Sequence, residues 1–332
     1  MDIMRVTVDD RSAVEEVVHL GEAVDKVDSP WVYPETVASV NGWLVHGWDG
    51  DPPELFVLRS GGRVVAAGEV GFSSYDNPDL AWLSVRVHPD HRRQGHGTRL
   101  FAALSDRATQ MGRTSFGTGA WESAAARGFA EQAGYRFVLS EMHRRLDVDD
   151  VPDGFSDLVD RCRREEAAAY EFLTMSGPVP EDLAEPMTVL WAAINDAPLD
   201  DLEMEPEVFP IERIRAYEHS QTSRGRRLHR VIARHRETGE LAGHTIVAIE
   251  AERPHFGNQH DTSVVRAHRG NRLGITLKGL LLSYLREVEP QVRTFDTWNA
   301  ESNDYMIAIN DAMGFRVMGR ALDFQKKGSA PA

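Results

Sequence analysis

The sequence contains a single cysteine and no long apolar run. Cys162 by itself excludes an intramolecular disulfide and any site built from several cysteines. No uninterrupted apolar stretch approaches the roughly 20 residues that span a bilayer. The N-terminal MDIMRVTVDD carries acids where a signal peptide is first basic and then apolar. We therefore expect a cytoplasmic protein without a membrane partner, a disulfide framework or a bound metal.

Positive charge is also in short supply. The chain has 37 Lys and Arg against 52 Asp and Glu, which gives a net charge of -15 at pH 7. A chain this acidic repels phosphate backbones unless its basic residues gather on one face, so we expect no nucleic-acid partner. The charge suits a cationic small substrate, although an acidic surface also keeps a protein in solution.

The length and an internal repeat both indicate two domains. A chain of 332 residues exceeds what one hydrophobic core usually supports. The stretch VRVHPDHRRQGHGTRL (Val85 to Leu100) returns as SVVRAHRGNRLGITLK (Ser263 to Lys278), and His91 matches His268 at an offset of 177 (268 − 91). Later, AGYRF matches MGFRV at an offset of 180 (315 − 135). The chain therefore contains two copies of one unit.

Both copies predict the same order of elements. The first predicts helices at 11–25, 34–47 and 122–133, a further helix after the repeated loop, and strands at 5–8, 54–59, 63–72, up to 87, 114–118 and 135–146. The second predicts helices at 181–195, 210–222, 272–288 and 302–312 and strands at 227–235, 241–252, 259–266, 292–298 and 315–325. We expect an α/β (α+β) protein in which each copy is a mixed, mostly antiparallel sheet flanked by helices.

The acidic stretch LDVDDVPDG, with its proline and glycine, separates the copies. We place an N-terminal domain at 1–147, a linker at 148–167 and a C-terminal domain at 168–332. In the first copy, the last strand at 135–146 would complete its own sheet.

The repeated loop has the composition of an anion site. It lies between a strand and the N-terminus of a helix, where unpaired backbone N–H groups and the helix dipole attract negative charge. Gly95 and Gly97 leave room for a close ligand and permit backbone angles that other residues avoid. Arg92 and Arg93 add positive charge, so a pyrophosphate uses all of these features at once.

The spacing Arg-x-x-Gly-x-Gly after Val-x-Val-x-Pro resembles motif A of the GNAT acetyltransferase superfamily, which binds the pyrophosphate of acetyl-CoA. The resemblance covers both halves, so the chain is similar in architecture to tandem GNAT proteins such as the mycothiol synthases. It implies acetyl-CoA (coenzyme A) as cofactor, with backbone contacts to the pantetheine from Val85, Arg86 and Val87. It also implies pyrophosphate contacts from Arg92, Arg93, Gln94, Gly95, His96, Gly97 and Thr98.

In the second copy, the resemblance implies cofactor contacts from Thr262, Val264, Arg269, Gly270, Asn271, Arg272, Leu273 and Gly274. Arg272 stands where the first copy has Gly95. A side chain at this position, which the family usually keeps bare, either weakens the anion site or supplies a compensating cation.

Many GNAT members carry the pattern Asn-x-x-Ala-x-x-x-Tyr-x-x-x-Gly-Phe, in which Asn contacts the cofactor and Tyr protonates the leaving thiolate. Counting back from Gly314 places Asn303 on the Asn position and Asn310 on the Tyr position, while the first copy has Ser123 and Ala130 there. Neither copy keeps the tyrosine, and only the second keeps the asparagine. We therefore assign the chemistry to the C-terminal half, with Asn303 at the cofactor.

Two further residues are candidates for proton transfer. Tyr305 is a nearby phenol that could serve as the acid, or it is an exposed helix tyrosine. Asp261, in the strand segment NQHDTSV, is the candidate base, because a buried carboxylate can accept an ammonium proton. It is equally consistent with a hydrogen-bonded structural aspartate.

An acidic run, NDAPLDDLEMEPE, follows the first helix of the second copy. Asp200, Asp201 and Glu203 could recruit an amine there, or the run could be a solvated loop.

We predict an N-acetyltransferase, monomeric or homodimeric, that transfers an acetyl group from acetyl-CoA to a primary amine of a small-molecule acceptor by direct attack. The alternative is an acyl-CoA-binding sensor or scaffold with one or both domains inactive, which the missing tyrosines favour. 

Overall fold

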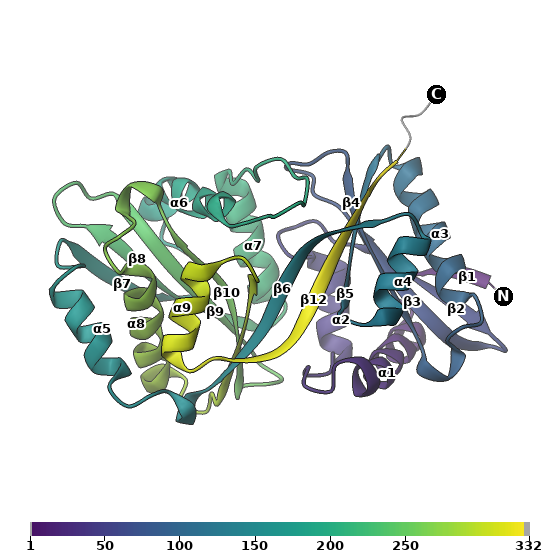
Figure 1. Cartoon of the computed structure of the whole chain (residues 1–332), viewed down its shortest axis with the longest axis horizontal. Helices are drawn as coiled ribbons and strands as arrows, with labels where there is room; N and C mark the ends of the chain where they lie inside the picture. The colour runs from purple at the N-terminus through teal and green to yellow at the C-terminus, as the bar shows by residue number, and fades with distance from the viewer. Residues whose placement is uncertain (1, 329–332) are drawn as a thin grey trace. The chain divides into compact units, whose positions relative to one another are not determined.

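The computed structural model describes residues 2–328, which form two compact units (Figure 1). Unit 1 contains the chain up to Ser140, the segment Leu199–Pro206 and the chain from Gly319 onward. Unit 2 contains Glu141–Pro198 and Glu207–Met318. Each unit has its own set of strands, its own helices and its own apolar clusters.

Unit 1 is built on a sheet with the strand order β1-β2-β3-β4-β5-β12. All of its neighbouring strands are antiparallel except β4 and β5, which are parallel. Its elements are β1 (Asp2–Val6), α1 (Arg11–Asp28), α2 (Val37–His46), β2 (Glu54–Ser60), β3 (Arg63–Gly71), β4 (Leu80–Val87), the 3-10 turn η1 (Pro89–His91), α3 (His96–Gln110), β5 (Ser115–Trp121), α4 (Ala124–Gln132), the start of β6 (Arg136–Asp147) and most of β12 (Arg316–Lys327).

Unit 2 repeats this plan with the strand order β6-β11-β10-β9-β8-β7, in which β10 and β11 are the parallel pair. Its elements, besides the end of β6, are η2 (Val148–Asp150), α5 (Phe155–Arg164), β7 (Tyr170–Ser176), α6 (Glu181–Ala192), η3 (Ala193–Asp196), α7 (Ile211–Ser223), β8 (Arg226–His235), β9 (Leu241–Glu250), β10 (Phe256–Val264), η4 (Arg266–His268), α8 (Leu273–Val288), β11 (Thr294–Ala300) and α9 (Asp304–Met313). The predicted fold class, mixed and mostly antiparallel sheets flanked by helices, is confirmed in both units.

The two units exchange their last strands, which differs from the sequence-based expectation. The end of β6 pairs with β11 of unit 2, from Glu141 opposite Ala300 to Asp147 opposite Thr294. The end of β12 pairs with β5 of unit 1, from Ala321 opposite Trp121 to Lys327 opposite Ser115. Alternating apolar residues fix which face of a strand is buried but not which strand it pairs with, so the sequence did not reveal the exchange.

The segment predicted as a linker contains the helix α5. Its residues Phe155, Val159 and Cys162 follow helical spacing and are buried in the core of unit 2. The boundaries 1–147 and 168–332 describe the repeated units of the sequence and stay a prediction, whereas the compact units of the structure are made of separate chain segments.

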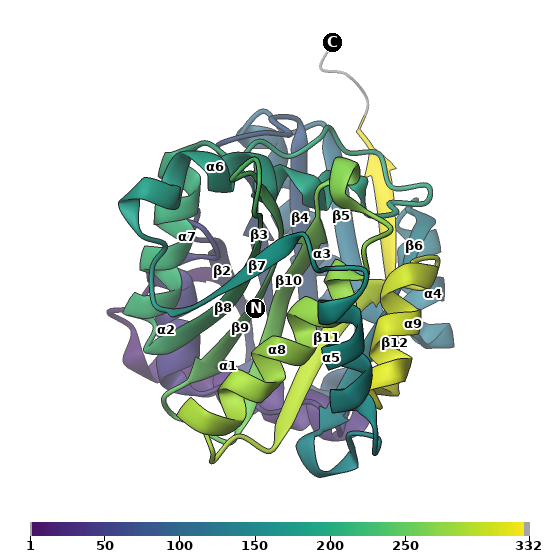
Figure 2. The ribbon, with the colours of Figure 1, turned by 90° about the vertical axis from the view of Figure 1, so that its left-hand side faces the viewer.

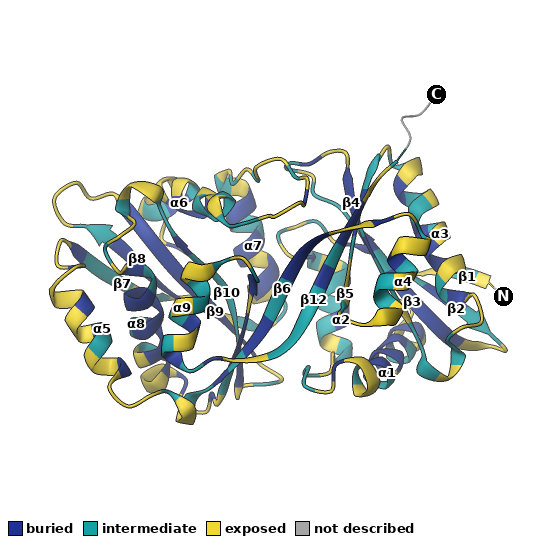
Figure 3. Ribbon diagram, viewed as in Figure 1, coloured by how far each residue is buried: buried dark blue, intermediate teal, exposed yellow. Residues whose placement is uncertain are grey.

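Helices cover both faces of the sheet in unit 2. Alternate β8 residues divide between two apolar clusters: Leu228 and Ile232 pack with α6 and α7, and Val231 and Ala233 pack with α8. Figure 2 shows α6 and α7 on one side of the strands and α8 and α9 on the other, and Figure 3 shows the strands between them as largely buried. We call these two sides the α6/α7 face and the α8/α9 face.

Unit 1 has the matching arrangement, with α1 and α2 over one apolar cluster and α3 over the other. Among residues 2–328, no helix is long and apolar enough to cross a membrane.

The exchanged strand β12 makes a testable contribution to unit 1. Phe324 is buried in the same cluster as Leu83 and Phe116 of unit 1. We expect Phe324→Ala to lower the free energy of unfolding by roughly 3–5 kcal/mol and to reduce hydrogen-exchange protection in β5, its hydrogen-bonded neighbour. Val317→Ala, at a half-exposed position of β12, is the control and should change stability by less than about 0.5 kcal/mol. A loss of protection confined to unit 2 would contradict this assignment.

Candidate active site

The central parallel strands of each unit stop pairing partway along their length. In unit 1, β4 pairs with β5 only from Leu80 to Leu83, although it continues beside β3 to Val87. In unit 2, β10 pairs with β11 only from Phe256 to Asn258 and continues beside β9 to Val264. Each strand end therefore keeps one hydrogen-bonding edge for a ligand, as in the addition of an extended chain to a sheet.

The strand residues predicted to contact the pantetheine lie on these open ends. Val85, Arg86 and Val87 are at the end of β4, and Thr262 and Val264 are at the end of β10. Backbone amides along such an edge suit a ligand that itself carries amides. Arg86 directs its side chain to Glu35, at 3.2 Å, so it is the backbone of Arg86 that this edge offers.

A helix N-terminus follows each open strand end. The first helical hydrogen bond of α3 runs from Arg99 N to Gly95 O, which leaves the N–H groups of His96, Gly97 and Thr98 at the helix start. In α8, the corresponding bond runs from Thr276 N to Arg272 O. Both loops therefore present the backbone donors of an anion site.

The two loops adopt the same backbone with different residues. In the first, Arg93 (φ 59°) and Gly95 (φ 82°) are left-handed, and in the second, Gly270 (φ 86°) and Arg272 (φ 54°) take the matching positions. Glycine and arginine have thus exchanged places between two left-handed positions. Arg272 does not disrupt the second loop, and both arginine side chains are exposed to solvent.

The second glycine of each loop lies in close packing with its neighbours. A Cβ on Gly97 would lie 3.2 Å from Val87 Cγ2, and one on Gly274 would lie 2.7 Å from Ile309 Cδ1 of α9. These glycines therefore let the helix start lie close to its neighbours, a role that the sequence analysis did not separate from ligand access.

The first arginine of each loop bonds to groups of the chain itself. Arg92 donates to Val87 O at 3.1 Å and forms a two-pronged ion pair with Asp28 at the end of α1, at 2.7 and 2.9 Å. Arg269 donates to Val264 O at 3.1 Å and to Asp196 at 2.7 Å. These bonds tie the loop to the strand end and to the first helical region, so any contribution to phosphate binding is shared with a carboxylate.

The remaining predicted loop residues are placed as follows. His96 is 4% exposed, and its Nε2 has no hydrogen-bond partner among residues 2–328. Gln94 donates to Asp90 O at 3.4 Å, and Thr98 is exposed. Asn271 donates to Tyr170 Oη at 3.2 Å and to His268 O at 3.0 Å, while Leu273 is buried in the core of unit 2.

Asp261 lies at an irregularity in β10. Gln259 pairs with Val247 and Asp261 with Ile246, so His260 between them is bulged out of the ladder. The matching pairing of β3 and β4 in unit 1 is regular. An Asp261 carboxylate oxygen lies 2.7 Å from His244 Nε2, and the other accepts a hydrogen bond from Ser263 Oγ at 2.8 Å.

The bulged His260 belongs to the same polar group on the α6/α7 face. Its Nδ1 lies 2.6 Å from Tyr217 Oη of α7, and burial, with smaller contributions from Arg226 and Arg224, lowers the pKa of His260 well below its usual value. The structure thus brings the predicted Asp261 together with two histidines and a tyrosine, none of which had been proposed as a site residue from the sequence.

The candidates at the start of α9 are separated from this group. Asn303 caps α9 and accepts a hydrogen bond from Met306 N at 3.1 Å, as Ser123 caps α4. The Tyr305 side chain is 89% exposed. Further along α9, Asn310 is fully buried and accepts a hydrogen bond from Lys278 of α8 at 2.6 Å. Lys278 was not among the residues predicted from the sequence, although a lone lysine in the apolar run ITLKGLLL was a signal.

The acidic run Asp200–Glu203 is held within unit 1. Asp201 N donates to Val138 O, and Glu203 forms ion pairs with Arg136, at 2.5 Å, and with Lys327. These contacts commit the Glu203 carboxylate to two cations of the chain itself. The role of Asp200, Asp201 and Glu203 in recruiting an amine stays a prediction.

Unit 1 carries a carboxylate that the sequence analysis missed. Glu69 of β3 accepts a hydrogen bond from Trp43 Nε1 at 3.1 Å, and burial, with the nearby Glu35, raises the pKa of Glu69. Asp25, whose pKa is also raised by burial, lies on the same side of the sheet. Unit 1 thus has its own candidate base on the face covered by α1 and α2.

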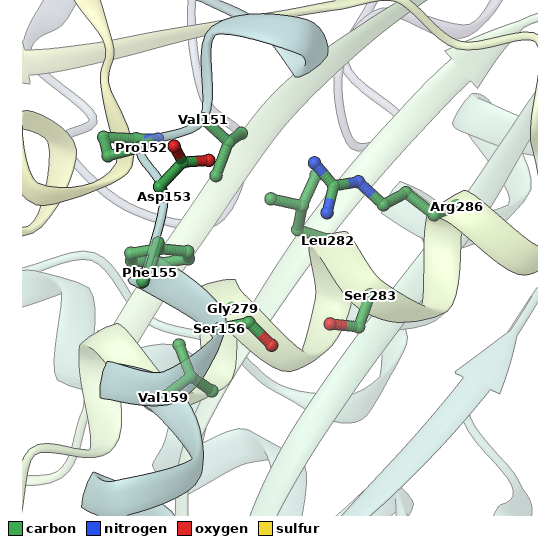
Figure 4. Close-up of a pocket in the computed structure, with 11 residues that line it drawn as sticks. Val151, Pro152, Asp153, Phe155, Ser156, Val159, Gly279, Leu282, Ser283 and Arg286 are labelled. Atoms are coloured by element: carbon green, nitrogen blue, oxygen red, sulfur yellow. The ribbon is translucent and has the colours of Figure 1, made fainter.

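A separate cavity of about 260 Å³ lies between α5 and α8 (Figure 4). Pro152, Phe155, Leu282 and Arg286 are among its lining residues, and none of the predicted site residues lines it. In residues 2–328, no group of three or more His, Cys, Asp or Glu side chains is placed to hold a metal ion.

A family model matches part of the N-terminal half of the chain. Residues 25–135 match the acetyltransferase (GNAT) family, and this range includes the first anion loop and the open end of β4. The chain therefore contains a GNAT acetyltransferase domain. A comparison with curated proteins gives no significant match.

Solved structures extend the similarity to both halves. A tandem GNAT protein from the clavulanic acid biosynthesis pathway is 27% identical, with a TM-score of 0.80 and coverage of 100% of this chain and 99% of that one. The fold is also shared with a GCN5-related N-acetyltransferase from Sphaerobacter thermophilus (17% identity, TM-score 0.70, 98% and 95% coverage). It is shared as well with N-myristoyltransferase from Saccharomyces cerevisiae, solved with bound myristoyl-CoA (11%, 0.60, 98% and 80%). The whole chain thus has the fold of a tandem GNAT protein, and acyl transfer is the activity that its family and fold support.

The left-handed arginines give a test of the two loops. A non-glycine residue with positive φ costs roughly 1 kcal/mol, so we expect Arg272→Gly and Arg93→Gly each to raise the melting temperature. Each change also removes an exposed cation at a loop, so CoA binding by that unit should weaken roughly three- to fivefold. Thermal unfolding and calorimetric titration with CoA would measure both effects. A lower melting temperature in both variants would contradict strain at these positions.

Proposed function

We propose that the chain is an N-acetyltransferase that transfers an acetyl group from acetyl-CoA to a primary amine of a small molecule. The observation that carries the proposal is the combination, in each unit, of an open strand edge with a helix N-terminus directly after it. The edge suits the pantetheine amides and the helix start suits the pyrophosphate. The 27%-identical tandem GNAT protein is described as solved without AcCoA, and the naming of AcCoA for that protein supports acetyl as the acyl group here.

The open edges define what the backbone does in this reaction. The N–H groups of His96, Gly97 and Thr98, with their counterparts in α8, neutralise the phosphate charge and fix the position of the cofactor. Backbone N–H groups on the unpaired edge of the strand are donors for the thioester oxygen, where negative charge develops during attack. Direct attack of this kind needs no covalent intermediate on the enzyme.

Unit 2 is the better candidate for the chemistry. The bulge at His260 sets Asp261 at the open end of β10, with His244 Nε2 2.7 Å from its carboxylate. Asp261 would accept the proton that the amine nitrogen loses as it attacks, directly or through a water molecule. The matching residue of unit 1 is Ser84, which has no comparable basicity.

The alternative function is binding of an acyl-CoA without turnover, in one or both units. Incubation of the chain with acetyl-CoA and a panel of primary amines, with thiol release as the signal, separates the two functions. We expect release that depends on the amine. Tight CoA binding without thiol release for any amine would contradict the enzyme function and support the sensor or scaffold.

The assignment to unit 2 is tested by a matched pair of variants. We expect Asp261→Asn to lower kcat by roughly 10²- to 10⁴-fold, because general-base assistance is lost. Glu69→Gln changes the carboxylate of unit 1 and should leave kcat close to that of the wild type, because in this assignment Glu69 takes no part in the reaction. Thiol release at saturating substrate measures both. The reverse pattern would place the chemistry in unit 1.

A further inference from the structure

Unit 2 contains an isolated buried ammonium group on the α8/α9 face. Lys278 is 1% exposed, and its Nζ donates to Asn310 Oδ1 at 2.6 Å and lies 4.8 Å from the ring centre of Phe315. Asn310 Nδ2 donates in turn to Asn299 Oδ1 of β11 at 3.1 Å. No carboxylate among residues 2–328 forms an ion pair with Lys278, so its charge is held by amide dipoles and an aromatic ring.

This arrangement destabilises the folded state. An ammonium buried without a counter-ion costs several kcal/mol. Burial, with a smaller contribution from Arg144 of β6, lowers the pKa of Lys278 to about 7. Arg144 is itself paired with Asp311 of α9, at 2.5 Å. A lysine that is half protonated at neutral pH can release a proton, which an ordinary surface lysine does not do readily.

The lysine lies beside the open end of the sheet. Asn299 follows Asp296, the last β11 residue that pairs with β10, so it belongs to the diverging part of the strand. Asn299 shares its side of β11 with Phe295, which packs against α8. Through Asn310 and Asn299, Lys278 is therefore connected to the open strand end from the α8/α9 face, whereas Asp261 and His244 lie on the α6/α7 face, where His244 contacts Trp191.

Unit 1 lacks this polar group at the matching positions. Phe101 matches Lys278 at the offset of 177 (278 − 101), and Ala130 matches Asn310 at the offset of 180 (310 − 130). Phe101 and Ala130 are buried in an apolar cluster, where Phe101 contacts Tyr135 with ring centres 5.4 Å apart. The same site of the fold thus accepts an apolar filling, so the lysine is not needed to build it.

We infer that Lys278 is the acid that protonates the departing CoA thiolate in unit 2, with Asn310 as the positioning residue that holds its ammonium group. The inference rests on the proposed function. It assigns proton uptake and proton delivery to opposite faces of one sheet.

The proton balance of the step is complete. The amine nitrogen forms a bond to the acyl carbon, and Asp261 takes the proton that the nitrogen loses. When the carbon–sulfur bond breaks, its electron pair goes to sulfur, and the Lys278 ammonium gives its proton to the thiolate. Neutral Lys278 and protonated Asp261 return to their starting states by exchange with solvent between turnovers.

The first test compares Lys278→Met with the wild type. We expect kcat to fall roughly 10²- to 10³-fold, while the KM for acetyl-CoA stays within about threefold. Because the acid must be protonated, the wild-type kcat should fall as pH rises through about 7. Lys278→Met should lack this limb of the pH profile, that is, the decrease in kcat above about pH 7. Phe101→Leu, at the matching site of unit 1, should keep both the wild-type kcat and this limb. Asn310→Ala should lower kcat and shift the limb, because Lys278 loses its hydrogen-bond acceptor.

Stability gives a readout that separates an acid from a structural lysine. The pKa of Lys278 is lower in the folded than in the unfolded chain, so the folding penalty is fully present below pH 7 and vanishes above about pH 10.4. Lys278→Met should therefore raise the melting temperature by roughly 2–8 °C, with the larger gain at lower pH. A variant that is less stable and less active would indicate a structural lysine and overturn the inference.

A binding measurement keeps the inference independent of the acceptor. An ammonium beside the thiol stabilises the thiolate, so the ultraviolet titration of bound CoA should show a lowered thiol pKa in the wild type and a higher one in Lys278→Met. An unchanged thiol pKa overturns the inference whether or not an amine acceptor is found. A thiol pKa that depends on Lys278, with no thiol release for any amine, would retain the proton donor and overturn the proposed function instead.

Discussion

The open edge between two parallel strands is the constraint on which the site depends in each unit. β4 leaves β5 after Leu83, and β10 leaves β11 after Asn258. Backbone groups that lose their partners in this way must find others in water or in a ligand. The helix that follows each strand presents its own unpaired N–H groups at the same end. The two sets of donors together form a site that suits an extended polar ligand with an anionic end.

Duplication shows which features of the site the fold itself requires. Both loops keep two left-handed residues, a glycine that allows helix packing, and an arginine that bonds to the preceding strand end and to an aspartate. These features recur in both loops, although arginine and glycine have exchanged places at the two left-handed positions. We therefore assign them to maintaining the backbone of the loop. Unit 2 has the bulge at His260 and the buried Lys278. At the matching positions, unit 1 has a regular strand pairing and the apolar residue Phe101. Such differences, which carry a cost in stability, are where we place the chemistry.

Much of the fold could be predicted from the hydrophobic periodicity of the sequence and from its glycine and proline turn signals. The helix predicted at 272–288 is α8 (Leu273–Val288), and the strand predicted at 135–146 is β6 (Arg136–Asp147). The same reasoning missed α5, because an acidic stretch with proline and glycine precedes it and suggested a linker. It also assigned β6 to the first copy alone, because the choice of a strand partner depends on contacts between residues far apart in the sequence.

The sequence by itself determined the duplication, the strand-loop-helix units and the two anion loops, since glycine and arginine at fixed spacing act through local backbone geometry. Only the tertiary structure decided where the side chains of those loops and of the helices after them go: Arg92 of the first loop to Asp28, and Lys278 of α8 into the core beside Asn310. A charge changes its chemistry when other elements exclude water from it. Burial of that kind is a property of the packed fold, which brings together α8, α9 and β11 from separate parts of the chain.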